Sequence, residues 1–201
     1  MVQIPDEAGC RELMRRHSML PNIVEHSYRV CQVASYLGEA LNRNGGELNP
    51  ELITASSLLH DITKTRSLQT RENHAETARD LLCELGYPEV ADIVHLHVRM
   101  KSSEFTASLS CSHIVNYADK RVRHTSVVSL EERFQDLAVR YGLSSASLER
   151  LQKLKDEMCR LETRIFRRLS IEPGDLEGFN ALSVFDLKTI PAGLNGDLRC
   201  P

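Results

Sequence analysis

Leu58-Leu59-His60-Asp61-Ile62-Thr63-Lys64 ends an apolar helical run with an imidazole and a carboxylate on adjacent residues. Lys64 follows His60 by four residues, about one helical turn. Burying a histidine beside an aspartate costs free energy unless their polar atoms are paired, and a divalent metal ion pairs with both. The stretch therefore predicts a metal site whose remaining ligands come from other parts of the chain.

The apolar run before the His-Asp pair has the start signals of a helix. Asn49 is a typical N-cap, and Pro50 suits the first helical turn. The preceding helix is expected to begin near Asn22, as its N-cap, and to continue until Gly45-Gly46 interrupts the pattern. His26 lies on the apolar face of that helix and is expected to point inward, together with Val30, Val33, Ala34, Leu37 and Leu41.

After the His-Asp pair, a third histidine is expected where a loop meets a helix. Residues 65–72 are polar and predict a link without regular structure. Asn73 then has the features of a cap for a helix whose first residue is His74, and Gly86 ends that helix. His74 is therefore placed at a helix N-terminus, where its side chain can reach a neighbouring site.

The next helix is expected to begin at Pro88 and to carry another inward histidine. His97 continues the apolar face, whereas His95 falls on the polar side. Residues 101–108 predict a polar connection. The helix after it places Asp119 at an inward position among Cys111, Val115, Ala118 and Val122, where a carboxylate needs a partner.

Two amphipathic helices are expected near the C-terminus, over residues 130–141 and 144–170. The second has a narrow apolar stripe that predicts packing on a neighbouring helix or a homodimer, formed by Leu148, Leu151, Leu154, Met158, Leu161, Ile165 and Leu169. The whole pattern predicts an all-α fold. We expect a metal-binding helical domain over residues 1–125, a helical extension over 126–170 and an irregular tail over 171–201.

Composition limits the classes of partner. The 201 residues carry a net charge of −3 and 5% aromatic residues, which disfavour an extended nucleic-acid track. No apolar run approaches the ~20 residues of a membrane span, so no membrane partner and a cytoplasmic location are predicted. The six cysteines lack close pairing and are expected to be free, buried thiols.

The candidate metal ligands are considered together. Each histidine alone suits an ordinary core position, and Asp119 alone has Lys120, Arg121 and Arg123 as candidate partners. The set is difficult to satisfy without a metal ion, because it brings several imidazoles and carboxylates to inward or helix-terminal positions: His26, His60, Asp61, His74, His97 and Asp119. Nitrogen and oxygen ligands without thiolate suit one or two divalent ions of the manganese, iron, nickel or magnesium class.

The order His26, His60-Asp61, Asp119 resembles that of the HD-domain metal-dependent phosphohydrolases, an all-helical superfamily, over roughly residues 15–125. His74, His97 and Lys64 make the chain similar to the HDIG subgroup, with Thr63 in place of the usual glycine. The resemblance implies an HD-like helical bundle with additional C-terminal helices. It also implies that the residues matching His26, His60, Asp61 and Asp119 hold one metal, that Asp61 bridges to a second, and that His74 and His97 complete the second site.

The expected chemistry is hydrolysis of a phosphoester or phosphoanhydride bond by a metal-bound hydroxide, with a small phosphorylated molecule, foremost a nucleotide, as substrate. RNA ends and cyclic phosphates remain open as substrates. Asp61 and Lys64 are the predicted catalytic residues, since the lysine reaches the same cavity and can stabilise charge on the phosphoryl oxygens. Arg66, Arg99 and Arg123 follow ligand positions and are candidates for binding the substrate.

Two alternatives belong to other classes. The chain can be a regulatory or interaction module that retains the fold and the metal but lacks turnover. It can also be a helical scaffold whose histidines are structural, and the absence of bound metal would favour that interpretation.

Overall fold

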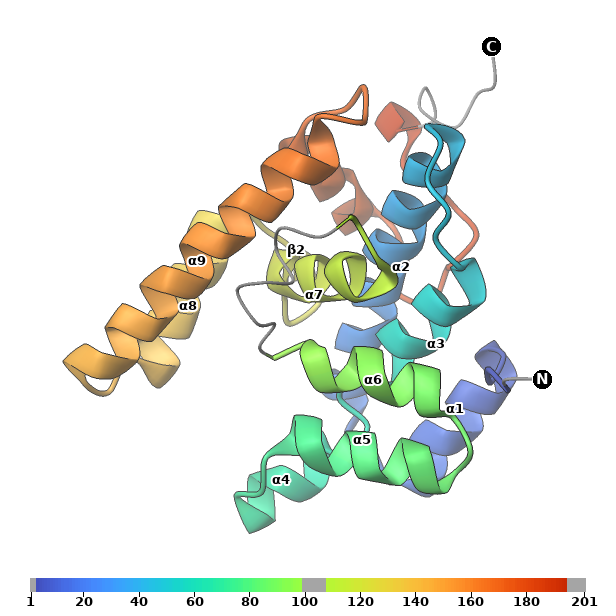
Figure 1. Ribbon diagram of the computed structural model, residues 1–201, viewed down its shortest axis with the longest axis vertical. Coiled ribbons are helices and arrows are strands. Elements are labelled where there is room, and N and C mark those ends of the chain that lie inside the picture. Colours follow the sequence, from blue (N-terminus) through green and yellow to red (C-terminus); the bar gives the residue numbers. More distant parts are fainter. Residues whose placement is uncertain (1–2, 99–107, 195–201) are drawn as a thin grey trace.

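The computed structural model describes residues 3–98 and 108–194 and confirms an all-α fold (Figure 1). The β-structure of the described ranges is a two-stranded antiparallel hairpin, formed by β1 (Val122–Arg123) and β2 (Ser126–Val127). The α-helices there are α1 (Glu7–Arg16), α2 (Pro21–Arg43), α3 (Pro50–Leu59), α4 (Lys64–Thr70), α5 (His74–Glu84), α6 (Pro88–Leu96), α7 (Cys111–Arg121), α8 (Leu130–Tyr141) and α9 (Ser145–Phe166).

Several helix ends lie where the sequence predicts them. The Asn49 side chain accepts hydrogen bonds from the first-turn backbone N–H groups of α3, and Asn73 caps α5 in the same way. Gly86 follows α5 with φ of 84°, a conformation that glycine adopts without strain. The N–H of Tyr87 then donates to the carbonyl of Leu82, which satisfies one of the last carbonyls of α5.

Two local predictions are wrong. Helix α2 begins at Pro21 after Leu20, so Asn22 is not its N-cap. The polar residues 65–72 do not form an irregular link, because most of them belong to α4. This short helix contributes no buried residue, so apolar periodicity gave no signal for it. The predicted polar connection over 101–108 lies outside the described residues except for Ser108.

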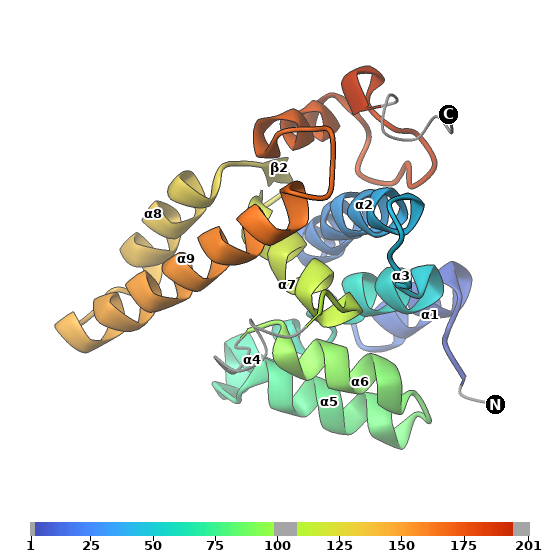
Figure 2. The same ribbon diagram turned by 45° about the horizontal axis from the view of Figure 1, so that its top comes forward.

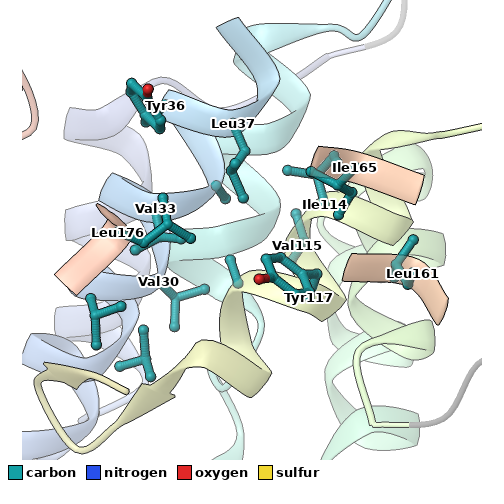
Figure 3. Close-up of a cluster of buried hydrophobic side chains, with 14 of the residues drawn as sticks. Val30, Val33, Tyr36, Leu37, Ile114, Val115, Tyr117, Leu161, Ile165 and Leu176 are labelled. Carbon is teal, nitrogen blue, oxygen red and sulfur yellow. The ribbon is translucent and has the colours of Figure 1, made fainter. Parts of the chain in front are cut away.

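Helices α2 and α7 form the centre of the larger core cluster, and α9 packs against α7 (Figure 3). The cluster also contains Leu176 of the C-terminal segment, which Figure 3 shows beside Val33. Its other labelled members include Val30, Leu37, Ile114, Val115, Leu161 and Ile165. A second cluster joins α1, α3, α5 and α6, which lie together in Figure 2. The apolar residues beside the His-Asp pair, Leu58, Leu59 and Ile62, belong to this second cluster, and His60 and Asp61 are themselves buried.

The C-terminal helices α8 and α9 form an antiparallel hairpin that extends from the body (Figure 1). The middle and C-terminal part of the predicted stripe is buried within the chain, at Met158, Leu161 and Ile165, whereas Leu148 is exposed near the hairpin tip. The homodimer through residues 144–170 stays a prediction.

The described part of the predicted irregular tail contains two 3-10 helices, η2 (Pro173–Ala181) and η3 (Ala192–Leu194). These segments are packed into the core, because Leu176, Phe179 and Leu194 are buried. The guanidinium of Arg29 on α2 donates to the carbonyls of Phe179 and Leu182, which ties the segment to the helix that carries His26. The domain boundaries near residues 125 and 170 stay predictions.

The five cysteines in the described ranges carry free thiols, as predicted. Burial was predicted less well: Cys10 and Cys31 are buried, whereas Cys83 and Cys159 are exposed. No helix in the described ranges has the length and apolar character needed to cross a membrane.

Candidate metal centre

Three imidazoles of the centre are held in place by backbone carbonyls. Nδ1 of His60 lies 2.7 Å from the carbonyl oxygen of Ser57, and Nδ1 of His26 lies 2.8 Å from that of His124. Nδ1 of His97 likewise donates to the Val94 carbonyl. A carbonyl can only accept, so Nδ1 carries the proton in each neutral ring and Nε2 presents a lone pair. This orientation is the usual preparation of a histidine for metal binding.

The first group of candidate ligands consists of His26, His60 and Asp119, from α2, the end of α3 and α7. Oδ1 of Asp119 lies 3.1 Å from Nε2 of His26 and 3.8 Å from Nε2 of His60. Nε2 of His60 is fully buried and has no hydrogen-bond partner in the described structure. A buried lone pair without a donor, directed at a carboxylate, fits a cation better than it fits a packed core.

The second group consists of Asp61, His74 and His97. Oδ1 of Asp61 lies 3.2 Å from Nε2 of His74 and 3.6 Å from Nε2 of His97. The two Nε2 atoms lie 3.2 Å apart. Because His97 Nε2 presents a lone pair, this close group of acceptors needs a proton or a metal ion between them.

Asp61 connects the two groups. Its Oδ1 faces the second group, whereas its Oδ2 lies 3.6 Å from Nε2 of His60 in the first. One carboxylate therefore presents one oxygen to each group, the arrangement that a bridging ligand requires.

Lys64, the first residue of α4, lies at the second group. Its Nζ is 3.4 Å from Oδ1 of Asp61 and 3.4 Å from Nε2 of His74. The side chain is 30% exposed, so the ammonium lies between the buried ligands and solvent. It occupies a position from which it can contact an anion that enters from solvent.

Burial and neighbouring charges shift the pKa values of these groups. Burial lowers the pKa of His60 to about 4 and also lowers that of His74. Burial alone would raise the pKa of Asp61, but the neighbouring His60, His74, His97 and Lys64 hold it well below its usual value. The pKa of Asp119 is likewise held well below its usual value, chiefly by Lys120 and His26 acting against burial. These shifts favour neutral imidazoles at His60 and His74 and ionised carboxylates at Asp61 and Asp119, which are the forms that bind metal.

The remaining predicted site residues differ in placement. Arg66 is exposed and pairs with Glu72 at 3.0 Å, rather than with any ligand. Arg123 is half-buried on β1 and lies near Glu132 of α8. Arg99 lies outside the described residues.

Sequence reasoning gave too little weight to one residue, Lys120. The sequence indicates Lys120 only as one of several candidate partners for Asp119, whereas in the structure its Nζ lies 2.5 Å from Oδ2 of that carboxylate and the side chain is buried. Arg121, another candidate partner, points away and contacts Glu162 and Tyr117. The role of the His124 carbonyl had no sequence signal, because any residue type supplies a carbonyl.

A family model described as HD domain matches residues 23–164, which include every one of these candidate ligands. The chain belongs to the HD domain family. Members of this family are generally metal-dependent hydrolases, and the two groups of histidine and aspartate side chains in this chain could hold divalent metal ions.

Two curated proteins are similar to this HD domain chain. An uncharacterized protein of Methanocaldococcus jannaschii, MJ0778, is 27% identical over 150 residues, which cover 68% of this chain and 88% of that protein. The tRNA (cytidine(56)-2'-O)-methyltransferase of Thermoplasma volcanium is 31% identical over 96 residues, which cover 47% of this chain but 26% of that protein. No solved structure matches the chain.

Proposed function

We propose that this HD domain protein is a phosphohydrolase that cleaves a phosphoester or phosphoanhydride bond of a small phosphorylated substrate, with a nucleotide as the foremost candidate. The observation that carries the proposal is the position of Asp61. One of its oxygens faces His60, whose Nε2 has no hydrogen-bond partner in the described structure, and the other faces His74 and His97.

In this proposal His26, His60, Asp61 and Asp119 hold one divalent ion, and Asp61, His74 and His97 hold a second. The ions would supply a water of lowered pKa and would neutralise charge on the phosphoryl oxygens. The donor set contains imidazole nitrogen and carboxylate oxygen without thiolate, which suits manganese, iron, nickel or magnesium. The presence of the second group also supports assignment to the HDIG-like subgroup.

The protein's own residues have distinct proposed roles. The Lys64 ammonium binds a phosphoryl oxygen and stabilises the negative charge that develops there during bond cleavage. Asp61, held ionised, would accept a hydrogen bond from the attacking water and so orient it. Arg66, Arg99 and Arg123 are the proposed contacts to the rest of the substrate, and alanine at each is expected to raise KM more than it lowers kcat.

The similarity to a protein named as a tRNA methyltransferase does not carry that activity to this chain, because the match covers a quarter of the relative. It is nevertheless a reason to include RNA ends and cyclic phosphates among the substrates tested.

The proposal is tested by metal content and phosphate release. The purified protein, His60→Ala and His74→Ala are analysed for bound metal and incubated with nucleotides, short RNAs and cyclic phosphates. We expect two ions per wild-type chain, about one in His74→Ala and a larger loss in His60→Ala. His95→Ala is the matched control. His95 lies on α6, two residues before His97, but belongs to neither group of candidate ligands.

The outcomes separate the alternatives. Metal binding without phosphate release from any substrate would favour the inactive regulatory module. Absence of metal after loading with each candidate ion would contradict the phosphohydrolase and favour the helical scaffold.

A further inference from the structure

Two buried side chains of α7 close the C-terminal end of α6. Nδ2 of Asn116 lies 2.9 Å from the carbonyl oxygens of both Leu96 and His97. Nζ of Lys120 lies 3.0 Å from the same His97 carbonyl. Asn116 and Lys120 are four residues apart and therefore lie on one face of α7, next to the end of α6.

These contacts answer a requirement of helix termini. The last carbonyls of a helix have no partner within the helix, and burying them without donors is costly. The backbone of His97 is buried, so it needs donors from another element. Two carbonyls lie within hydrogen-bond distance of Nδ2, which also fixes the orientation of the Asn116 amide, since only its nitrogen can donate to them.

Lys120 contacts both groups of candidate ligands. Besides the His97 carbonyl, its ammonium binds Oδ2 of Asp119 and leaves Oδ1 of that carboxylate to face His26 and His60. The buried ammonium of Lys120 thus leaves Asp119 a single free oxygen in the first group and holds the backbone of His97 in the second. Lys120 is 6% exposed and Asn116 is fully buried, so solvent cannot replace these contacts.

We propose that Asn116 and Lys120 are positioning residues that set the affinity of the second cation by fixing His97, and that Lys120 also weakens the first cation by occupying Oδ2 of Asp119. The inference rests on the proposed function. Neither residue touches the position of a cation, so their effects act through His97 and Asp119.

The two residues make different predictions. Asn116→Ala removes donors only from the end of α6, so it weakens the second cation and leaves the first unchanged. Lys120→Met removes a donor to His97 and also removes positive charge from Asp119, so it weakens the second cation and tightens the first. Loss of an outer contact of this kind typically lowers metal affinity about 10–100-fold.

The experiment is a calorimetric titration of Mn²⁺ into metal-free protein, with electron paramagnetic resonance as a second measurement. Wild type is expected to bind two ions and to give the signal of a spin-coupled pair. At the same Mn²⁺ concentration both variants are expected to give the six-line signal of an isolated ion, with the second binding step weakened about tenfold or more. A general loss of stability would weaken both binding steps. Weakening of the second step without weakening of the first therefore indicates that the residue positions His97.

Two variants serve as matched controls. Asn42→Ala removes another amide that binds a backbone carbonyl, that of Leu48, and Lys155→Met removes another lysine from an ion pair with Glu131. Both are expected to retain two Mn²⁺ ions. Should Lys120→Met fail to fold, Asn116→Ala carries the test alone.

The possible failures are distinguishable. Two ions bound with wild-type affinities by Asn116→Ala and by any folded Lys120→Met would overturn this inference and leave the phosphohydrolase proposal intact. A wild type that binds one ion would also overturn the inference, because the second step would not exist. A wild type that binds none would overturn both.

Discussion

The carbonyl oxygen of His124, in the turn between β1 and β2, lies 2.8 Å from Nδ1 of His26. The two residues are 98 positions apart, and His124 has φ of 56°, in the left-handed region that favours glycine. The turn therefore directs a carbonyl at a candidate ligand at some cost in backbone strain.

Substitutions at His124 are expected to distinguish the role of its backbone carbonyl from that of its side chain. Glycine and asparagine both tolerate positive φ, so His124→Gly and His124→Asn should keep the carbonyl in place and retain metal. Valine is strained there by ~1–2 kcal/mol, so His124→Val should unfold at lower urea and bind the first cation more weakly. Equal metal affinity in all three variants would show that the turn does not position His26.

Lys64 is expected to affect turnover more than metal binding. Its ammonium lies 3.4 Å from Asp61, but a cation does not ligate a metal ion. Lys64→Ala should lower kcat about 100-fold or more while the metal content changes little. Lys153→Ala, which changes an exposed lysine of α9, serves as the control. An unchanged kcat in Lys64→Ala would show that Lys64 has no catalytic role.

Stability of the metal-free protein is expected to fall on acidification. The pKa of His60 is about 4 in the folded chain because of burial, below the ~6.5 of an exposed histidine, so the unfolded state binds more protons between these values. The free energy of unfolding should decrease between pH 6.5 and 4 by on the order of 3 kcal/mol from this residue. The lowered pKa of His74 acts in the same direction.

Urea titrations at pH 7.5 and 4.5 in the presence of a chelator measure this dependence. His60→Gln, which cannot titrate, should show a smaller difference between the two pH values. An equal difference in the variant would assign the effect to other groups.

Arg121 is expected to matter for stability rather than for metal binding. The buried guanidinium donates to the hydroxyl of Tyr117 at 2.6 Å and to Glu162 of α9 at 3.2 Å, and so joins α9 to the helix that carries Asp119. Arg121→Met leaves Glu162 without its charged partner and should lower the free energy of unfolding by ~3–5 kcal/mol. Chemical denaturation measures the loss of stability, and metal analysis of the folded protein should show the wild-type number of bound ions. A loss of metal in parallel with the loss of stability would contradict a purely structural role for Arg121.

The sequence by itself determined the all-α class, most helix ends and the inward placement of the candidate ligands. These features follow from local physics. A helical period of 3.6 residues puts His26 and Val30 on one face, Asn49 and Asn73 satisfy nearby N–H groups, and Gly86 accepts a positive φ. The same rules failed for α4, which is too exposed to show apolar periodicity, and for the start of α2, where proline begins the helix without a side-chain cap.

Only the tertiary structure decided which atoms of those ligands meet. The sequence gives no information on which oxygen of Asp61 faces His74 and His97, or on the contact between Lys120 and the His97 carbonyl, because each depends on the relative orientation of separate helices. The partners of the three Nδ1 atoms are backbone carbonyls, which carry no residue identity. Local periodicity selected the residues of the candidate centre, and helix packing arranged them into two adjoining groups that share one carboxylate.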